Sequence, residues 1–367
     1  MKIDLLRAHN LRCFDALEIV PGPRLNWLVG PNGAGKTSLL EGIHTLSHGR
    51  SFRAAGREAM ARRGQSGYDI YAELRHESGS RYRLGMAREN ARWQIRVDGI
   101  ACTTLQPLLE SCAVVCFEPG SHGLIVGHSE ERRRFLNWGV FHVEHDSLTL
   151  WRDYRRVLRQ RNTLLREQAP DVQFEPWERE MERYARLLEA GRKAYVESLV
   201  PNLRAFSARF LSELGEPRFI YRPGWDPQEA LTAQLAEQRD RDRQRGHTRH
   251  GPHRADWALV FEHAPGREYL SRGQTKLVAM ICVLAQAAQF AEHAGEWPIL
   301  CIDDLGSELD AQHQEQVLQW LTAQPVQAWI TATAPPADSG PPLTTVFHVE
   351  HGTMRCIQAP VSRINDV

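Results

Sequence analysis

The feature that most constrains this sequence is a glycine-rich segment near the N-terminus. Residues 30–37 read GPNGAGKT and match the pattern GxxxxGK[ST] of a phosphate-binding loop. The apolar residues 25–29 before it predict a strand, and the leucine spacing after Thr37 predicts a helix. A strand, a glycine loop and a helix in this order form the phosphate site of many α/β nucleotide-binding proteins. The sequence therefore predicts an α/β fold with a nucleotide at the start of this helix.

The residue types in the loop fit the chemistry of a triphosphate. Glycines let backbone N–H groups close around phosphate oxygens, and the helix N-terminus adds a favourable dipole. Lys36 is expected to reach the β and γ phosphates, and the Thr37 hydroxyl is expected to ligate magnesium. An ordinary glycine turn is the alternative. The predicted nucleotide-binding residues of the loop are Gly30, Pro31, Asn32, Gly33, Ala34, Gly35, Lys36 and Thr37.

A second candidate half-site lies near residue 300. Residues 297–304 read WPILCIDD, an apolar strand that ends in two adjacent carboxylates. A buried strand that ends this way needs a cation nearby, so we expect Asp303 in the magnesium shell and Asp304 beside the attacking water. A solvated turn after an edge strand is the alternative. These two carboxylates and Lys36 are the predicted catalytic residues.

Composition limits the partners and the compartment. The chain has 45 basic and 45 acidic residues, so a polyanion has to be met by a local patch of charge. The longest apolar run, residues 277–285, is far shorter than the roughly 20 residues that span a bilayer, and no signal-peptide core is visible. We expect a cytoplasmic protein with no membrane partner. The seven cysteines include no CxxC pair and are expected to be buried thiols, with a metal pair at Cys112 and Cys116 as the alternative.

The middle of the chain differs from both ends. Stretches rich in Arg, Glu and Leu at 130–168 and 175–214 predict two antiparallel helices about 58 Å long, at 1.5 Å per residue. Strand-like segments lie on either side, at 25–29, 68–74, 82–86, 93–97, 113–117, 299–302 and 329–331. We therefore predict a head that is split in sequence by a helical arm. Its N-terminal part is 1–128, the arm is 129–250, and the C-terminal part is 251–367.

The order of four motifs resembles that of the ABC-type ATPases. GPNGAGKT, LSRGQ at 270–274, CIDD at 301–304 and SELD at 307–310 are similar to their Walker A, signature, Walker B and D-loop. The resemblance implies an ABC-type P-loop ATPase head with a mixed sheet and helices. It also implies an ATP-dependent homodimer, in which Ser271, Gly273 and Gln274 contact the nucleotide held by the partner. Since Ser271 is also a good N-cap, a purely structural role is the alternative.

Spacing and further motifs narrow the resemblance. The separation between the Walker A and signature motifs, from residue 37 to residue 270, is longer than in transporter ATPases, because it contains the helical arm. The arm is too short for a chromosome-condensing SMC protein. The chain resembles the RecF family of bacterial recombination mediators over nearly its whole length, through HNLRCF, GHSEERRRFLNW, GPHRADW, LSRGQTKLV and CIDDLGSELD. That resemblance implies an ATP- and Mg²⁺-dependent protein that binds DNA, works with RecR and RecO mediators, and promotes RecA loading and SOS induction. An SMC-like tether and a transporter-coupled ATPase are the alternatives.

Departures from the usual ABC pattern predict slow hydrolysis. The carboxylate at the catalytic position is Asp304 instead of Glu, and the strand that ends at residues 330–333 carries no switch histidine. We therefore expect a weak, DNA-stimulated ATPase that acts as a switch. Glu118 lies near the Q-loop position, and that assignment stays open. Arg53 resembles the arginine loop of SMC-like heads, where it would approach phosphate or DNA; a solvated arginine is the alternative.

Two basic clusters are candidates for nucleic acid. The spacing i, i+3, i+4 and i+7 places Arg152, Arg155, Arg156 and Arg159 on one stripe of the first arm helix, where they could follow phosphates. A solvated coiled-coil face is the alternative. A second cluster, at 239–254, mixes arginines with acids and predicts a charged loop in part. Within it, His253 and Arg254 are candidates to contact nucleotide or to signal between sites.

Overall fold

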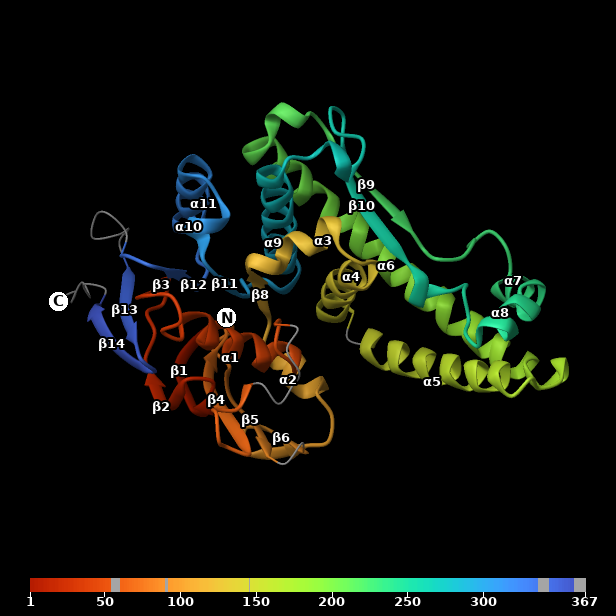
Figure 1. Ribbon diagram of the computed structural model, residues 1–367, viewed down its shortest axis with the longest axis horizontal. Coiled ribbons are helices and arrows are strands. Elements are labelled where there is room, and N and C mark those ends of the chain that lie inside the picture. Colours follow the sequence, from red (N-terminus) through yellow and green to blue (C-terminus); the bar gives the residue numbers. More distant parts are fainter. Residues whose placement is uncertain (54–59, 90–91, 145, 336–342, 360–367) are drawn as a thin grey trace. The chain divides into compact units, whose positions relative to one another are not determined.

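Contacts within the chain divide it into two compact units. The computed structural model describes residues 1–53, 60–89, 92–144, 146–335 and 343–359 (Figure 1). One unit consists of Met1–Ser121 and Cys282–Val367, and the other of His122–Ile281. The phosphate-binding loop and the Asp303 strand fall in the first unit, and the LSRGQ motif falls in the second. The division into two units follows compactness alone. The boundaries of the head and the arm, near residues 128 and 250, therefore stay a prediction.

A mixed sheet of six strands forms the centre of the first unit. Its order is β14-β13-β3-β12-β11-β8, and all neighbours are parallel except β13 and β14. The bounds are β3 Leu25–Val29, β8 Val114–Phe117, β11 Ile299–Ile302, β12 Ala328–Ala332, β13 Thr344–Glu350 and β14 Thr353–Gln358. Ile302 lies opposite both Phe117 and Ile330, and Thr331 lies opposite Leu28. The loops after β3, β8, β11 and β12 therefore leave from one edge of the sheet.

A second, antiparallel sheet belongs to the same unit. Its order is β2-β1-β4-β5-β6-β7, with β1 Lys2–Leu11, β2 Phe14–Ile19, β4 Gly67–Arg75, β5 Arg81–Glu89, β6 Arg92–Val97 and β7 Ile100–Cys102. Helix α1 (Lys36–His48) contacts β1 of this sheet and β8 and β12 of the other, and it is almost wholly buried. Helices α2 (Gln106–Ser111), α10 (Leu305–Glu308) and α11 (Ala311–Ala323) complete the unit. The predicted strands are confirmed to within three residues at each end.

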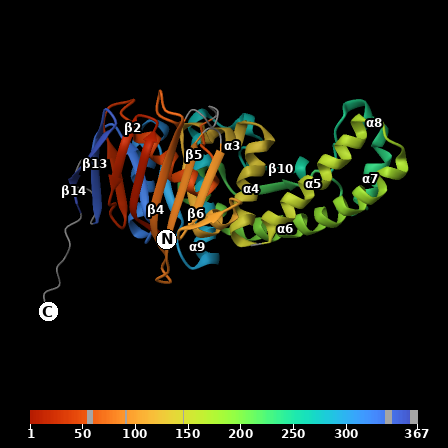
Figure 2. The ribbon, with the colours of Figure 1, turned by 90° about the horizontal axis from the view of Figure 1, so that it is seen from below.

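The second unit contains the long helices. It has α3 Gly123–Val126, α4 Ser129–Val143, α5 Ser147–Arg166, α6 Glu175–Phe210, α7 Leu231–Glu237 and α8 Arg239–Arg245, with a two-stranded antiparallel sheet of β9 Pro217–Arg222 and β10 Asp256–Phe261. Figures 1 and 2 show α5 beside α6. Leu165 packs with Phe174, the Arg161 side chain reaches Glu178, and the Arg192 guanidinium covers the Trp151 ring. These contacts confirm an antiparallel pair.

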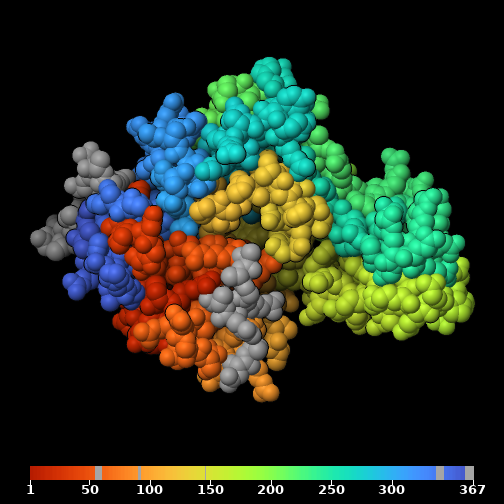
Figure 3. Space-filling model, in the orientation of Figure 1, coloured from red at the N-terminus to blue at the C-terminus, as the bar shows by residue number. Residues whose placement is uncertain are grey.

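One sequence prediction about this unit is wrong. The first arm helix is not continuous from 130 to 168, because α4 ends at Val143 and α5 begins at Ser147. Both helices pack on α6, and α4 also packs on β10 through Phe135 and Trp257. Within the cluster at 239–254, which was predicted to be a charged loop in part, α8 occupies Arg239–Arg245. Figure 3 shows the α7–α8 segment lying against α5.

Helix α9 (Arg272–Ala294) begins in the second unit and ends in the first. Within the part of the chain that the structure describes, α9 is long and apolar enough to cross a membrane. However, 78% of its most apolar window is buried inside the molecule. A helix that is apolar on all sides is typical of the core of a large protein as well as of a membrane span.

Candidate functional site

A pocket of about 370 Å³ opens at the edge of the central sheet where the parallel strands end. Its walls come from the loop after β3, the start of α1, the segment after α1, and the ends of β8, β11 and β12. The lining residues are Asn32, Gly33, Gly35, Lys36, Thr37, Ser38, Phe52, Arg53, Glu118, Pro119, Asp303, Asp304 and Thr331. All of them belong to the first unit.

The phosphate-binding loop has the backbone that its glycines predict. Gly30, Gly33 and Gly35 have φ angles of 152°, 81° and 117°, which side chains rarely allow. A Cβ at Gly30 would lie 2.1 Å from the Val349 carbonyl oxygen, and one at Gly35 would lie 2.5 Å from the Cys13 Sγ atom. Position 35 therefore needs glycine for two reasons: its positive φ and the lack of space for a Cβ. Helix α1 begins directly after this loop, so its N-terminal N–H groups face the pocket.

Lys36 is held over the loop by main-chain acceptors. Its Nζ donates to the Gly30 carbonyl at 2.6 Å and to the Pro31 carbonyl at 2.9 Å, and the residue is only 8% exposed. Burial lowers the pKa of Lys36, and the charges of Asp304 and Asp303 oppose that change. A buried ammonium that has only neutral acceptors gains from an anion, because a charged acceptor makes the stronger hydrogen bond.

Asp303 joins the loop to the neighbouring strand. Its Oδ1 accepts from the Thr37 hydroxyl at 2.9 Å and from the Thr331 hydroxyl at 2.7 Å, and the residue is 3% exposed. Burial raises the pKa of Asp303 in spite of both hydrogen bonds. The predicted magnesium ligands Thr37 and Asp303 are thus in direct contact. Their hydroxyl and carboxylate oxygens are hard donors that suit Mg²⁺, and a divalent cation would stabilise the buried carboxylate.

Asp304 forms the next part of the wall in a strained conformation. Its φ is 54°, in the left-handed region that glycine favours. The Asp304 N–H donates to the Thr331 Oγ1 at 2.7 Å, and the Asp304 carboxylate accepts from the Ser307 hydroxyl at 2.5 Å. Thr331 therefore contacts the carboxylate of Asp303 and the main chain of Asp304. Sequence reasoning missed Thr331, although a hydroxyl at the end of the strand after the Asp303 strand was a signal that could have found it.

Three further residues complete the wall. Glu118, at the open Q-loop position, follows β8 and accepts from the Gly120 N–H at 2.6 Å. Phe52, which the sequence analysis did not single out, lines the pocket beside Arg53. The Arg53 charge favours the ionised form of Asp303. Of the interpretations left open for Arg53, its position in the wall favours a contact with phosphate.

The signature residues form a capped helix start in the second unit. The Ser271 Oγ accepts from the Gln274 N–H at 3.2 Å, and the Ser271 N–H donates to the Gln274 Oε1 at 3.0 Å. This reciprocal pair is a capping box, so the N-cap interpretation is confirmed. Ser271 and Gly273 are exposed, and the space around the Gly273 Cα is open apart from the Ser271 hydroxyl. A role in binding the nucleotide of a partner stays a prediction.

The basic stripe is exposed on α5. Among the residues that the structure describes, Arg152, Arg155 and Arg159 have no acidic partner, and Arg156 lies 3.9 Å from Asp153. Three exposed arginines in the first part of α6 differ, because each pairs with a glutamate three or four residues before it: Arg179 with Glu175, Arg183 with Glu180, and Arg186 with Glu182. Within one antiparallel pair, these three α6 arginines are therefore neutralised by neighbours on their own helix, and those of the α5 stripe are not.

The second basic cluster makes contacts within the second unit. His253 is half-buried, its Nδ1 lies 2.7 Å from the Tyr154 hydroxyl, and desolvation lowers its pKa to about 3. The Arg254 guanidinium donates to the Thr248 carbonyl oxygen, although the residue is exposed. A contact of His253 or Arg254 with nucleotide, or a role in signalling between sites, stays a prediction.

Comparisons with known proteins cover nearly the whole chain. Residues 2–354 match the family model described as RecF/RecN/SMC N terminal domain. A protein of Stenotrophomonas maltophilia (strain R551-3) named DNA replication and repair protein RecF is 45% identical over 358 residues, which is 96% of this chain and 98% of the relative. A protein of the same name from Shewanella denitrificans is 34% identical over 362 residues, which is 98% of this chain and 100% of the relative.

Solved structures share the fold. One described as "Structure of the recombination mediator protein RecF-ATP in RecFOR pathway" has a TM-score of 0.89 at 23% identity and covers 97% of each chain. An SMC head bound to the C-winged helix domain of ScpA has a TM-score of 0.62 at 12% identity, covering 99% of this chain and 98% of that chain. The predicted fold class, an ABC-type ATPase head with an inserted helical arm, is confirmed.

Proposed function

The chain belongs to the RecF family, and we propose that it is an ATP-dependent DNA-binding protein of recombinational repair and replication restart. The relatives described above carry the name DNA replication and repair protein RecF. The observation that carries the proposal is the contact of Thr37, Asp303 and Thr331 at the mouth of the phosphate-binding loop. That contact joins the predicted Walker A and Walker B half-sites at one point.

In this proposal, residues of the first unit bind Mg²⁺ and ATP. Lys36 exchanges its main-chain acceptors for phosphate oxygens, while the loop N–H groups and the α1 N-terminus surround the phosphates. Thr37 and Asp303 would hold Mg²⁺, which would neutralise phosphate charge. Asp304 would orient the attacking water and accept its proton. Because a shorter Asp stands at this position and no switch histidine follows Thr331, hydrolysis would be slow and would serve as a switch.

Dimerisation would complete the nucleotide site. The pocket is lined by the first unit alone, and the exposed start of α9 offers Ser271, Gly273 and Gln274 to a second copy. The N-terminus of a 23-residue helix carries partial positive charge that suits the γ-phosphate. ATP would then hold two copies together, and DNA would be clamped by the dimer.

The unpaired arginines of α5 would contact DNA. Their freedom from acidic partners, in contrast to α6, supports phosphate binding over the solvated-face alternative. The stripe offers charge and no ordered set of base-reading groups, so the binding would be independent of sequence. We further propose a cytoplasmic protein that works with RecR- and RecO-like mediators at gapped DNA, promotes loading of the RecA recombinase, and contributes to SOS induction.

Size-exclusion chromatography with ATP, with ADP and without nucleotide tests this function. Wild type is expected to shift to a dimer with ATP and Mg²⁺ only. Ser271→Arg, placed at an exposed position, should bind ATP as wild type does but stay monomeric, because the bulky cation blocks the start of α9. Lys36→Ala is the control that should lose ATP itself. A normal ATP-dependent dimer of Ser271→Arg would refute the proposed docking, and wild type that fails to bind ATP would refute the function.

A further inference from the structure

The pocket wall that contains Phe52 and Arg53 is fastened to helix α1. The His44 Nδ1 lies 3.0 Å from the Arg50 carbonyl oxygen, and the His44 ring meets the Phe52 ring edge to face at 5.2 Å. One turn earlier on the helix, Glu41 accepts a hydrogen bond from the Ser51 hydroxyl. The same helix that begins with Lys36 therefore supports the opposite wall of the pocket.

Glu41 is the residue of α1 that holds the Phe52–Arg53 segment most firmly. Its carboxylate is fully buried, at 0% exposure, and it receives both the Nε and the Nη2 of Arg12, at 2.8 and 2.6 Å. Arg12 occupies the turn between β1 and β2 with a φ of 56°. A buried carboxylate with a bidentate guanidinium has a well-defined orientation, because both of its oxygens are committed.

Ser51 connects the Glu41 carboxylate to the main chain of Arg53. Its hydroxyl donates to Glu41 and accepts from the Arg53 N–H at 2.9 Å, so it is used in both directions. The two bonds fix the main chain at the residue whose side chain lines the pocket. Arg12, Glu41, Ser51 and Arg53 thus form a continuous polar chain from the β1–β2 turn to the pocket.

The charge balance of the pocket gives Arg53 a role. Three carboxylates line it, from Glu118, Asp303 and Asp304, against two cations, from Lys36 and Arg53. A bound triphosphate adds negative charge, so nucleotide affinity depends on both of these cations. Lys36 is held by the loop, whereas Arg53 is exposed and its main chain is fixed through Ser51.

We propose that Arg12, Glu41 and Ser51 are positioning residues that hold Arg53 at the phosphates of the bound nucleotide. This inference rests on the proposed function, since it concerns the same pocket. It adds that this chain of hydrogen bonds links the β1–β2 turn to the nucleotide. A change in the Arg12–Glu41 ion pair would therefore change nucleotide affinity or turnover, although Arg12 does not contact the ligand.

A double-mutant cycle tests the linkage. Kd for Mg–ATP and kcat/KM for hydrolysis are measured for wild type, Ser51→Ala, Arg53→Ala and the double variant. Arg53→Ala should lower kcat/KM about tenfold or more, because a charge-assisted hydrogen bond is lost. Ser51→Ala should lower it about fivefold, the effect of one hydrogen bond. If Ser51 acts through Arg53, the double variant should be no worse than Arg53→Ala.

Controls separate positioning from a structural role. Ser51→Thr keeps the hydroxyl and should restore the wild-type value, and Arg50→Ala changes a neighbouring arginine that does not line the pocket and should leave kcat/KM unchanged. Additive losses in the double variant, or a Ser51→Ala variant that lowers only the melting temperature, would overturn the inference. Neither result would affect the proposed function, which fails only if wild type does not bind Mg–ATP.

Discussion

At the level of single residues, Thr331 shows how one hydroxyl contacts two adjacent aspartates. It donates to the Asp303 Oδ1 at 2.7 Å and accepts from the Asp304 N–H at 2.7 Å. Both roles depend on the position of Thr331 at the end of β12, beside the strand that ends at Ile302. The left-handed backbone of Asp304 is sustained in part by this bond. Thr331 therefore stabilises the geometry on which metal binding and water activation depend.

Replacement of this hydroxyl should reduce turnover. Thr331→Val keeps the shape of the side chain but leaves Asp303 with one fewer donor and the Asp304 N–H without its acceptor. We expect kcat to fall about tenfold, because two hydrogen bonds of about 1 kcal/mol each are lost and the free energy is shared between ground and transition states. Thr333→Val, at an exposed position two residues on, is the matched control for a steady-state ATPase assay. Equal rates for the two variants would contradict the assigned role.

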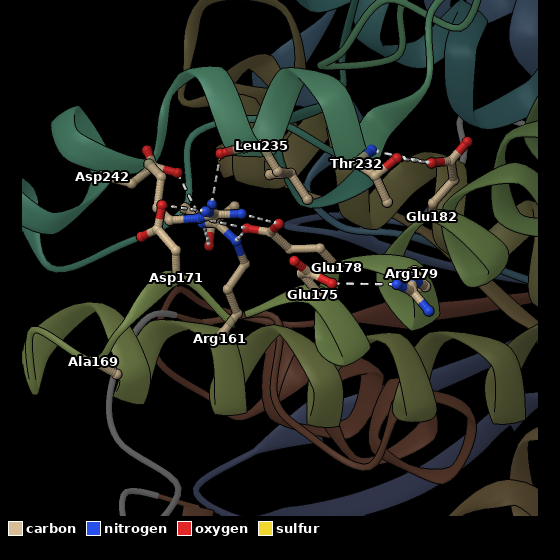
Figure 4. Close-up of polar contacts among 12 residues, drawn as sticks. Arg161, Ala169, Asp171, Glu175, Glu178, Arg179, Glu182, Thr232, Leu235 and Asp242 are labelled. Atoms are coloured by element: carbon tan, nitrogen blue, oxygen red, sulfur yellow. Dashed lines mark hydrogen bonds and ion pairs between the residues drawn. The ribbon is translucent and has the colours of Figure 1, made fainter. Parts of the chain in front are cut away.

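At the level of secondary-structure elements, a buried charge cluster joins α5, α6 and α8. Figure 4 shows Arg161 of α5 pointing between Glu178 of α6 and Asp242 of α8. Its guanidinium donates to these carboxylates at 3.0 and 2.8 Å and also to the Leu235 carbonyl oxygen at 3.1 Å. Arg161 lies two residues beyond the predicted basic stripe, on the same arginine-rich helix. Since it is 0% exposed, it serves packing, and only the neighbouring arginines are available.

Loss of one partner in this cluster should destabilise the arm. Arg161→Met retains volume but leaves the buried Asp242 without its cation and Glu178 with Arg239 alone, so we expect a loss of about 3 to 5 kcal/mol in the free energy of unfolding. Arg159→Met, two residues earlier and exposed, should change it by no more than about 0.5 kcal/mol. Urea denaturation followed by circular dichroism gives both values. A small effect at Arg161 would mean that the cluster is hydrated and not a source of rigidity.

At the level of the whole molecule, net charge is zero, so DNA binding depends on where arginines are left unpaired. The α5 stripe meets that condition, whereas Arg179, Arg183 and Arg186 of α6 do not. This difference could not be read from composition, because both helices are rich in arginine. It depends on glutamates that stand three or four residues before these three α6 arginines.

Matched charge reversals should separate the two faces. Changing Arg152, Arg155 and Arg159 to Glu should lower the affinity for duplex DNA. The magnitude of the slope of log K against log salt should also fall by about 2.7, at about 0.9 per phosphate contact. Changing Arg179, Arg183 and Arg186 to Glu is the control with equal charge and should leave the slope nearly unchanged. Fluorescence anisotropy over a salt series measures both, and similar slopes for the two variants would place the DNA elsewhere.

The local parts of this protein were predictable from the sequence. Three elements each follow from a motif of only a few residues: the Gly30–Thr37 loop, the helix after it, and the strand at 299–302 that leads to Asp303. Their geometry depends on backbone conformation and on short-range periodicity, and both are encoded locally. The sequence placed Thr37 and Asp303 in one magnesium shell, and the two side chains are in contact because the loops after the parallel strands β3 and β11 leave from the same edge of the sheet.

Other properties were decided only by the tertiary structure. The roles of Thr331, Arg161 and Glu41 depend on partners far away in the chain or on whether a neighbouring face is buried. A helical repeat cannot distinguish a buried arginine from an exposed one when both lie among leucines, and it could not show that the first arm helix is divided into α4 and α5. Strand register and helix packing bring these side chains together. The sequence by itself thus determined which chemical groups the site has, and the packing of the chain determined which of them are held in place and which are free to bind.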